Sequence, residues 1–250
     1  MKSNKQTLLK WISVATALCL WEGAAVVMDR SLLLAAPTDV VKRLLELVRE
    51  PDFLPTVLFS FSRIVLGFLI AFFAGTALGL FAGRFKTAEI FLMPYMITVR
   101  TVPVASFIIL SLMFLSGSQL SVFISFLMVL PIIYTNVLEG VKSADAQLLE
   151  MARMFRVPYG RRLGYILLPS VKPFLLSGTR AALGLCWKAG IAAEVIAVAR
   201  GSIGEKLYDA KVYFMTADLL AWTVILVLVS VLFEKLFRWL LEKAFALWEK

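Results

Sequence analysis

The sequence predicts an all-α polytopic membrane protein with six transmembrane helices, because its composition and the lengths of its apolar runs both fit a lipid environment. Hydrophobic residues make up 60% of the 250 residues, charged residues make up 17%, and the mean hydropathy is +0.86. An ordinary soluble domain contains about 25% charged residues. A bilayer core of about 30 Å needs about 20 apolar residues per helix, and several runs of this chain approach that length.

Six apolar runs fit this criterion, and the rest of the chain is expected to be helix or loop. They cover about residues 11–28, 64–83, 90–115, 120–138, 174–199 and 219–240. Pro94 and Pro103 in the third run and Pro131 in the fourth predict interrupted helices, because proline lacks a backbone N–H and clashes with the preceding turn. The first run resembles a signal peptide in its basic start, but no convincing A-x-A cleavage site follows it, so we expect it to stay as a span.

Small residues recur at every fourth position of the second run. They are Gly67, Ala71, Gly75, Gly79 and Gly83. Such a stripe lets the backbone of a neighbouring helix approach closely. We therefore expect a packing face here, with a sliding surface for conformational change as the alternative.

The segment between the first and second runs predicts an amphipathic helix at the outer surface. Pro37-Thr38-Asp39 opens it, and Thr38 or Asp39 can cap its first amides. Its apolar residues follow a helical period. They are Val40, Val41, Leu44, Leu45 and Val48. A cover over the bundle is the simpler interpretation, and a partner-specific role is the alternative.

Basic residues predict the orientation in the membrane. They gather before the first run, after the second, between the fourth and fifth, and after the sixth, which is one side for six spans. Those at the ends of the runs are Lys2, Lys5, Lys10, Arg84, Lys86, Lys235, Arg238 and Lys243. The positive-inside rule then places both termini in the cytoplasm. Topology accounts for the net charge of +9, and without aromatic-interleaved basic patches no nucleic-acid partner is expected.

The residues needed for chemistry are missing from the sequence. It has no histidine, and its two cysteines, Cys19 and Cys186, both lie in apolar runs. Neither a His/Cys metal centre nor a Ser/His/Asp arrangement is therefore available. The phosphate-binding loop G-x-x-x-x-G-K-[ST] is also absent. We expect no catalytic site, metal or cofactor on this chain, and an ATPase, if there is one, must be another polypeptide.

Three charged residues lie at the expected membrane depth: Arg100, Lys188 and Glu194. An unpaired charge there costs about 3 kcal/mol or more, so it normally faces protein or water. Each is a candidate for lining a translocation pathway and equally a candidate for bracing one helix against another. Arg63 and Arg180 lie nearer the ends of their runs, where long side chains reach the interface, and carry less weight.

A polar, Arg-rich segment of about residues 141–172 separates the fourth and fifth runs. It is too polar for hydrocarbon and too apolar for a flexible linker, which predicts a folded cytoplasmic loop. Glu150-x-Ala152, three further residues, position 156, nine more residues and Ile166-x-Leu168-Pro169 resemble the EAA motif of ABC importer permeases. The spacing of these positions is the specific part of the resemblance.

Other stretches resemble the sulfonate, taurine and nitrate subfamily of these permeases, which are binding-protein-dependent transport system inner-membrane components. They are Ser62-Arg63 leading to Gly67-Phe68, Arg100-Thr101-Val102-Pro103, Ala193-Glu194 and Gly201-Ser202-Ile203-Gly204. The resemblance spans about residues 38–240. It implies the type I ABC importer permease fold, in a single transmembrane permease domain covering residues 1–250. It also implies a homodimer, two cytoplasmic ATP-binding subunits that hold ATP and Mg, and an extracytoplasmic solute-binding protein.

The resemblance assigns the polar loop to coupling with the ATPase. A short helix of about Leu148 to Pro158 would insert into a cleft on that subunit, with apolar anchors and basic residues facing acidic partners. The residues expected in this role are Glu150, Ala152, Arg153, Met154, Phe155, Arg156, Val157, Pro158, Gly160 and Arg161.

Two positions of the loop depart from the motif. Met151 stands where the motif has Ala, which is a mild change, and Arg156 stands where the family usually has Gly. Either Gly160 supplies the flexibility of the turn, or the loop has a different local geometry.

The expected substrate is a small organic or inorganic anion of the sulfonate, taurine or nitrate type. Arg100 and Lys188 would offset the desolvation of a buried anion, although Glu194 partly cancels that preference. The subfamily also includes importers of pyrimidine vitamin precursors. A self-contained ion-coupled secondary transporter and a structural membrane scaffold are the alternatives from other functional classes.

Overall fold

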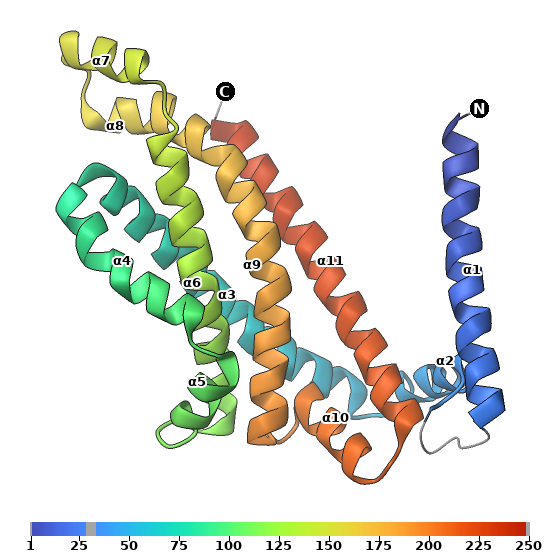
Figure 1. The fold of residues 1–250 in the computed structure, drawn as a ribbon. Coiled ribbons are helices and arrows are strands. Elements are labelled where there is room, and N and C mark those ends of the chain that lie inside the picture. The colour runs from blue at the N-terminus through green and yellow to red at the C-terminus, as the bar shows by residue number, and fades with distance from the viewer. Residues whose placement is uncertain (1, 29–33, 249–250) are drawn as a thin grey trace.

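The computed structural model describes residues 2–28 and 34–248, and every regular element in these ranges is helical (Figure 1). The elements are α1 (Lys2–Met28), α2 (Pro37–Leu47), α3 (Phe53–Arg84), α4 (Lys86–Thr101), α5 (Val104–Ser111), α6 (Gly117–Lys142), α7 (Ala146–Met154), α8 (Tyr159–Arg162), a π-helical turn η1 (Leu163–Leu167), α9 (Leu168–Ala197), α10 (Ile203–Val212) and α11 (Thr216–Trp248). The all-α prediction is confirmed.

Helices α3, α6 and α11 are long and apolar enough to cross a bilayer, and α4 with α5 adds one more if the bent pair counts as a span. The six predicted spans add α1 and α9 to these. Helix α1 contains a shorter apolar part, Ala15–Val27. Helix α9 has 30 residues, but Lys172, Arg180, Lys188 and Glu194 interrupt its apolar sequence. Of these four charged side chains, only Glu194 is buried by neighbouring helices.

The bundle is centred on α6, which packs against α3 on one side and α9 on another, while α11 runs beside α9 (Figure 1). Helix α1 stands apart from this bundle and contacts α2. Both ends of the described chain lie at the end of the bundle that carries α7 and α8 (Figure 1), as an even number of spans requires.

The glycine stripe of α3 is the face that packs on α6, which confirms the predicted close approach. A Cβ atom at Gly79 would lie 2.8 Å from Cβ of Val137, and one at Gly83 would lie 2.6 Å from Cγ1 of Val141. Any side chain at these positions would force the two backbones apart.

Aromatic rings fill the other side of α3, where it meets α9 and α11. Phe68 lies 4.9 Å from Phe237 and 5.9 Å from Phe233, between ring centroids, in edge-to-face arrangements. Trp187 of α9 contacts Phe61 and Phe233 in the same cluster. Rings in this geometry attract through their quadrupoles in addition to their dispersion contacts, so this cluster joins three helices.

The prolines have different effects in the two runs where breaks were predicted. The third run breaks at Val102 and Pro103, and α4 and α5 meet there at an angle of 96°. Pro94 lies inside α4, and Pro131 lies inside α6, which continues without a break from Gly117 to Lys142. The predicted interruption of the fourth run is therefore wrong. The reason is tertiary, because α3 and α9 both pack along α6.

Helix α2 forms where the sequence predicts it, but its cap and its buried face differ from the prediction. Ala36 occupies the N-cap without a side-chain hydrogen bond. Thr38 instead donates from Oγ1 to Glu22 of α1 at 3.0 Å. The fully buried apolar residues are Val40 and Leu47. Three positions expected on the apolar side are more than half exposed: Val41, Leu45 and Val48.

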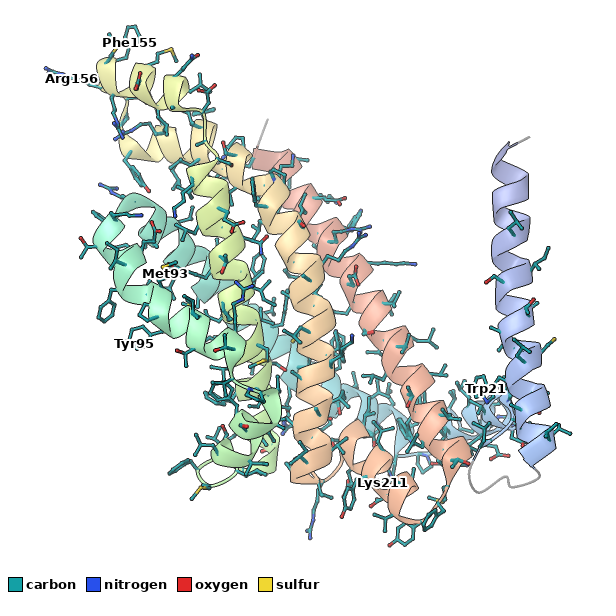
Figure 2. The ribbon with its side chains drawn as sticks, viewed as in Figure 1. Trp21, Met93, Tyr95, Phe155, Arg156 and Lys211 are labelled. Carbon is teal, nitrogen blue, oxygen red and sulfur yellow. The ribbon has the colours of Figure 1, made fainter. Side chains whose placement is uncertain are left out.

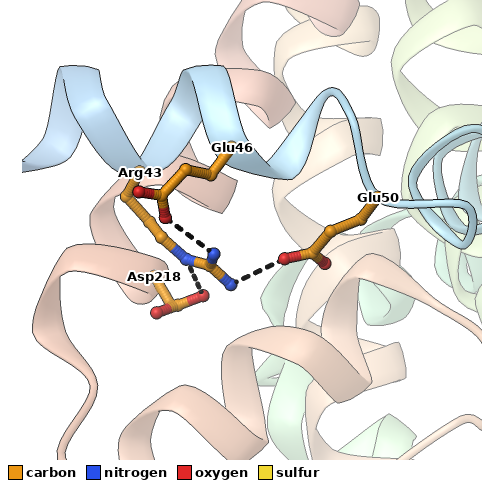
Figure 3. Close-up of polar contacts among 4 residues, drawn as sticks. All are labelled: Arg43, Glu46, Glu50 and Asp218. Atoms are coloured by element: carbon orange, nitrogen blue, oxygen red, sulfur yellow. Dashed lines mark hydrogen bonds and ion pairs between the residues drawn. The ribbon is translucent and has the colours of Figure 1, made fainter.

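A branched ion pair holds α2 against the start of α11 (Figure 3). The Arg43 guanidinium donates to Asp218 at 2.8 Å and to Glu46 at 3.1 Å, and it lies 2.9 Å from Glu50. Burial lowers the pKa of Arg43, but the hydrogen bonds to Asp218 and Glu46 and the neighbouring carboxylate charges raise it above its ordinary value overall. The contact explains why a charge-rich helix packs stably on the bundle.

Candidate functional site

The polar segment after α6 folds into a helical hairpin, which we call the coupling segment (residues 145–167). Asp145 caps α7 by accepting a hydrogen bond from the Gln147 amide at 2.8 Å. Helix α7 covers Ala146–Met154, so the predicted helix of about Leu148 to Pro158 begins and ends too late. The reasons are local, because Asp145 caps the helix before Ala146 and Arg156 has a left-handed conformation that a helix cannot continue through.

The turn after α7 is made by Arg156 itself. Its φ is 51°, in the left-handed region, and the next amide, of Val157, donates to the Ala152 carbonyl at 2.9 Å. Helices commonly end with a left-handed residue of this kind, usually glycine. Gly160 lies in α8 and takes no left-handed conformation. Of the two expected alternatives, the arginine therefore adopts the glycine-like geometry, at a cost of about 1–2 kcal/mol.

The tip of the coupling segment presents apolar side chains to its surroundings. Met154 is 83% exposed and Phe155 is 76% exposed. Figure 2 shows Phe155 and Arg156 pointing away from the bundle. Ala152 is buried and Val157 is half-buried. The remaining predicted coupling residues are exposed: Glu150, Arg153, Arg156, Pro158, Gly160 and Arg161.

Glu194 is completely buried where α9 meets α3 and α10. Its Oε2 accepts hydrogen bonds from Ser60 Oγ at 2.7 Å and from the Gly204 amide at 3.3 Å. Ser60 Oγ in turn accepts from the Ile203 amide at 2.9 Å. We call this group the Glu194 junction (Ser60, Glu194, Ile203 and Gly204). It satisfies two amides at the start of α10, which favours bracing as the role of Glu194.

The other two pathway candidates do not converge with Glu194. Arg100 and Lys188 have exposed side chains on α4 and α9, and neither makes an ion pair with any described residue. Arg100 borders a cavity of about 190 Å³ between α4 and α6, which Glu89, Glu139 and Lys142 also line. That cavity has both signs of charge, so it does not select an anion as the sequence suggested.

A groove of about 710 Å³ lies between α3 and α6 and is lined by Arg63. From the sequence, this residue carried less weight than Arg100, Lys188 and Glu194. Its Nε donates to the Ser118 carbonyl at 2.8 Å, and its guanidinium carbon lies 3.4 Å from the centre of the Phe59 ring. The two terminal guanidinium nitrogens have no hydrogen-bond partner among residues 2–28 and 34–248. The walls are mostly apolar, and the lining residues are Ser62, Arg63, Leu66, Ile70, Leu115, Ser118, Gln119, Val122, Phe123 and Phe126.

Arg63 and not Arg100 or Lys188 therefore combines a fixed guanidinium with space beside it. Sequence reasoning ranked it low because a long side chain near a span end reaches the interface without any function. The available signal was its place in the Ser62-Arg63 pair, one turn before the glycine stripe begins at Gly67. That position puts it beside the close contact of α3 with α6 at Gly67.

Comparison with known proteins assigns most of the chain to one family. Residues 75–244 match the family described as binding-protein-dependent transport system inner membrane component. The chain is 28% identical to the putative aliphatic sulfonates transport permease protein SsuC of Bacillus subtilis, over 86% of this chain and 78% of that protein. It is 26% identical to the taurine transport system permease protein TauC of Escherichia coli, over 92% of this chain and 86% of that protein. It is also 26% identical to the bicarbonate transport system permease protein CmpB of Synechococcus elongatus, over 72% and 66% respectively.

Proposed function

Because this chain belongs to the family of binding-protein-dependent transport system inner membrane components, we propose that it forms the translocation pathway of an ATP-driven ABC importer for small anions. The solutes named for its relatives are aliphatic sulfonates, taurine and bicarbonate. Each has an anionic oxygen group, and the first two also carry an aliphatic part. The proposed substrate class is therefore a small organic or inorganic oxyanion.

Coupling to a separate ATPase rests on the tip of the coupling segment. Two large apolar side chains, Met154 and Phe155, are exposed side by side on a folded hairpin. Such side chains bury well in a cleft of a partner, and basic neighbours such as Arg153 and Arg161 improve the fit to acidic residues. This exposed apolar tip is the observation that carries the ATP-driven function. ATP and Mg²⁺ are held by two partner subunits, and this chain contributes movement without catalysis.

The complete importer in this proposal contains two copies of the chain, with both termini in the cytoplasm. A solute-binding protein delivers the anion at the opposite face. ATP-dependent closure of the two ATPases would move the two coupling segments and switch the pathway between outward and inward access.

The groove beside Arg63 supports the choice of an anion. A guanidinium donates two parallel hydrogen bonds to a carboxylate-like or sulfonate-like group. The terminal nitrogens of Arg63 can donate such bonds, because only its Nε is used within the chain. The apolar groove walls suit the aliphatic part of a sulfonate or taurine. We propose Arg63 as the residue that binds the anionic group during passage.

The test is uptake by the whole importer in liposomes, using labelled taurine, methanesulfonate and bicarbonate. Arg63→Gln is expected to reduce uptake of the preferred anion by about tenfold or more, because a charged hydrogen bond contributes about 1.5–3 kcal/mol. The ATPase subunit should copurify with this variant in the same amount as with the wild type. Arg100→Gln and Lys188→Gln are the matched charge-removing controls and should retain uptake.

Three results would contradict parts of the proposal. Loss of uptake in Arg100→Gln or Lys188→Gln but not in Arg63→Gln would show that the pathway is lined by the residues predicted from the sequence. Transport only of a cationic pyrimidine would favour a vitamin-precursor importer. Uptake driven by an ion gradient in liposomes that contain this chain alone would favour a secondary transporter.

A further inference from the structure

A small cavity lies where the coupling segment meets the ends of α3 and α6. Its volume is about 230 Å³, below the range of about 300–1,000 Å³ that is usual for drug-sized ligands. The charged residues in its lining are three arginines: Arg84 at the end of α3, Arg153 of α7 and Arg162 of α8. No carboxylate lines the cavity.

The three guanidiniums have no counter-charge of their own. None of them makes an ion pair with a carboxylate in residues 2–28 or 34–248. The Arg162 Nε atom is buried and has no hydrogen-bond partner. A buried polar group without a partner is costly, and three cations around one space repel each other. The buried Arg162 Nε is therefore a donor that an anion in the cavity would satisfy, and the exposed Arg84 and Arg153 side chains border the same space.

Tyr159 fixes two of these arginines in place. Its ring centre lies 3.9 Å from the Arg84 guanidinium carbon and 5.9 Å from that of Arg162. Cation–π contacts of this kind orient a guanidinium without using its N–H donors. The donors of both arginines therefore stay available to a ligand.

We propose that this cavity binds an oxyanion of the phosphate type, either free phosphate or the phosphate of an anionic lipid headgroup. Guanidinium groups bind phosphate oxygens through paired hydrogen bonds. The cavity lies at the end of the bundle, between the spans and the polar coupling segment, and both sources of phosphate occur at that depth. The site is separate from the Arg63 groove and does not depend on the transported solute.

The oxyanion would connect the bundle to the coupling segment. Arg84 belongs to a long helix of the bundle, whereas Arg153 and Arg162 belong to the hairpin that carries the exposed tip. One anion bound to all three holds the hairpin against the ends of α3 and α6. With the anion bound, a movement of the tip would be transmitted to the bundle and would not be confined to the hairpin.

The experiment measures binding to the full-length purified chain. Labelled inorganic phosphate is titrated by equilibrium dialysis in sodium chloride at constant ionic strength, and thermal unfolding is followed in nanodiscs of phosphatidylcholine with and without phosphatidylglycerol. Arg162→Gln is expected to weaken phosphate binding, or the stabilisation by phosphatidylglycerol, by about tenfold or more in affinity. Arg161→Gln is the matched control for anion binding, since it removes an adjacent, exposed arginine of the same helix that does not line the cavity. Its affinity for phosphate and its stabilisation by phosphatidylglycerol should equal those of the wild type.

The two measurements, phosphate binding and thermal unfolding with phosphatidylglycerol, distinguish the two sources of the anion. Saturable phosphate binding in phosphatidylcholine nanodiscs supports a free oxyanion, and stabilisation only by phosphatidylglycerol supports a lipid headgroup. If Arg162→Gln does not fold, the affinity of Arg84→Gln is compared with that of Arg161→Gln instead. Equal affinities for Arg162→Gln and Arg161→Gln would overturn the proposal. The absence of binding in both measurements would also overturn it.

Discussion

The Glu194 junction and the coupling segment both place polar groups at the ends of helices, but they treat them in opposite ways. At the junction, Glu194 and Ser60 are completely buried and satisfy the amides of Ile203 and Gly204. In the coupling segment, Arg156 holds a strained backbone in an exposed turn, beside the exposed ring of Phe155. The amides at the start of α10 find hydrogen-bond acceptors within this chain, although Glu194 Oε1 has no hydrogen-bond partner among the described residues. The exposed turn instead presents its side chains to the surroundings.

The polar groups of the junction stabilise the fold, whereas we propose that the exposed groups of the coupling segment bind another subunit. A polar group with an internal partner contributes to the folding of this chain, and its loss leaves another buried group unsatisfied. An exposed apolar or basic side chain has few contacts within the chain, so it contributes little to folding. In the function proposed above, those at the tip contribute to docking instead. Substitutions in the two regions should therefore change different measurements.

The largest effect on folding is expected from Ser60→Ala. The substitution removes the donor to Glu194 and the acceptor of the Ile203 amide, and both remaining groups are buried. We expect the free energy of unfolding in detergent to fall by about 2 kcal/mol. Ser62→Ala is the control, because Ser62 is exposed and donates only to the Phe59 carbonyl of its own helix. Equal stabilities of the two variants would mean that the junction does not hold α10 in place.

Phe155→Ala should have the opposite profile. Its ring is 76% exposed, so its removal should leave the unfolding free energy unchanged. Docking of the ATPase should weaken by about 2 kcal/mol, or about 30-fold, as for a central aromatic anchor of an interface. Titration of the purified ATPase subunit onto the chain in nanodiscs measures this affinity. Tyr165→Ala removes an equally exposed ring from the π-helical turn, away from the tip, and serves as the control.

The smallest effect is expected from Arg156→Gly. Glycine adopts the left-handed φ of 51° without steric cost, whereas arginine pays about 1–2 kcal/mol there. The gain is reduced by the greater entropy of glycine in the unfolded chain, so we expect about 0.5–1 kcal/mol of added stability. Thermal unfolding of the purified variants measures this gain. Arg161→Gly is the control, because it places glycine inside helix α8 and should lower the stability of the protein. A loss of stability in Arg156→Gly would show that the arginine side chain, and not the backbone, determines the turn.

The local features of the molecule could be predicted from the sequence because they depend on neighbouring residues. The helix that starts at Pro37, the glycine stripe of α3 and the bend at Pro103 follow from periodicity, residue size and a missing N–H donor. The motif spacing identified the coupling segment for the same reason. The interruption at Pro131 was predicted wrongly, because the packing of α3 and α9 around α6 outweighed the local preference.

By itself, the sequence determined that the chain is a helical membrane protein, which runs of it are apolar and which segment between them is polar. Each of these depends on composition within a short window. Only the tertiary structure decided which charges meet. Ser60 and Glu194 are separated by 134 positions and yet share a hydrogen bond, while Arg100 and Lys188, the other two pathway candidates, are exposed. The groove beside Arg63 and the three-arginine cavity have the same origin, because both arise where helices distant in the chain pack together.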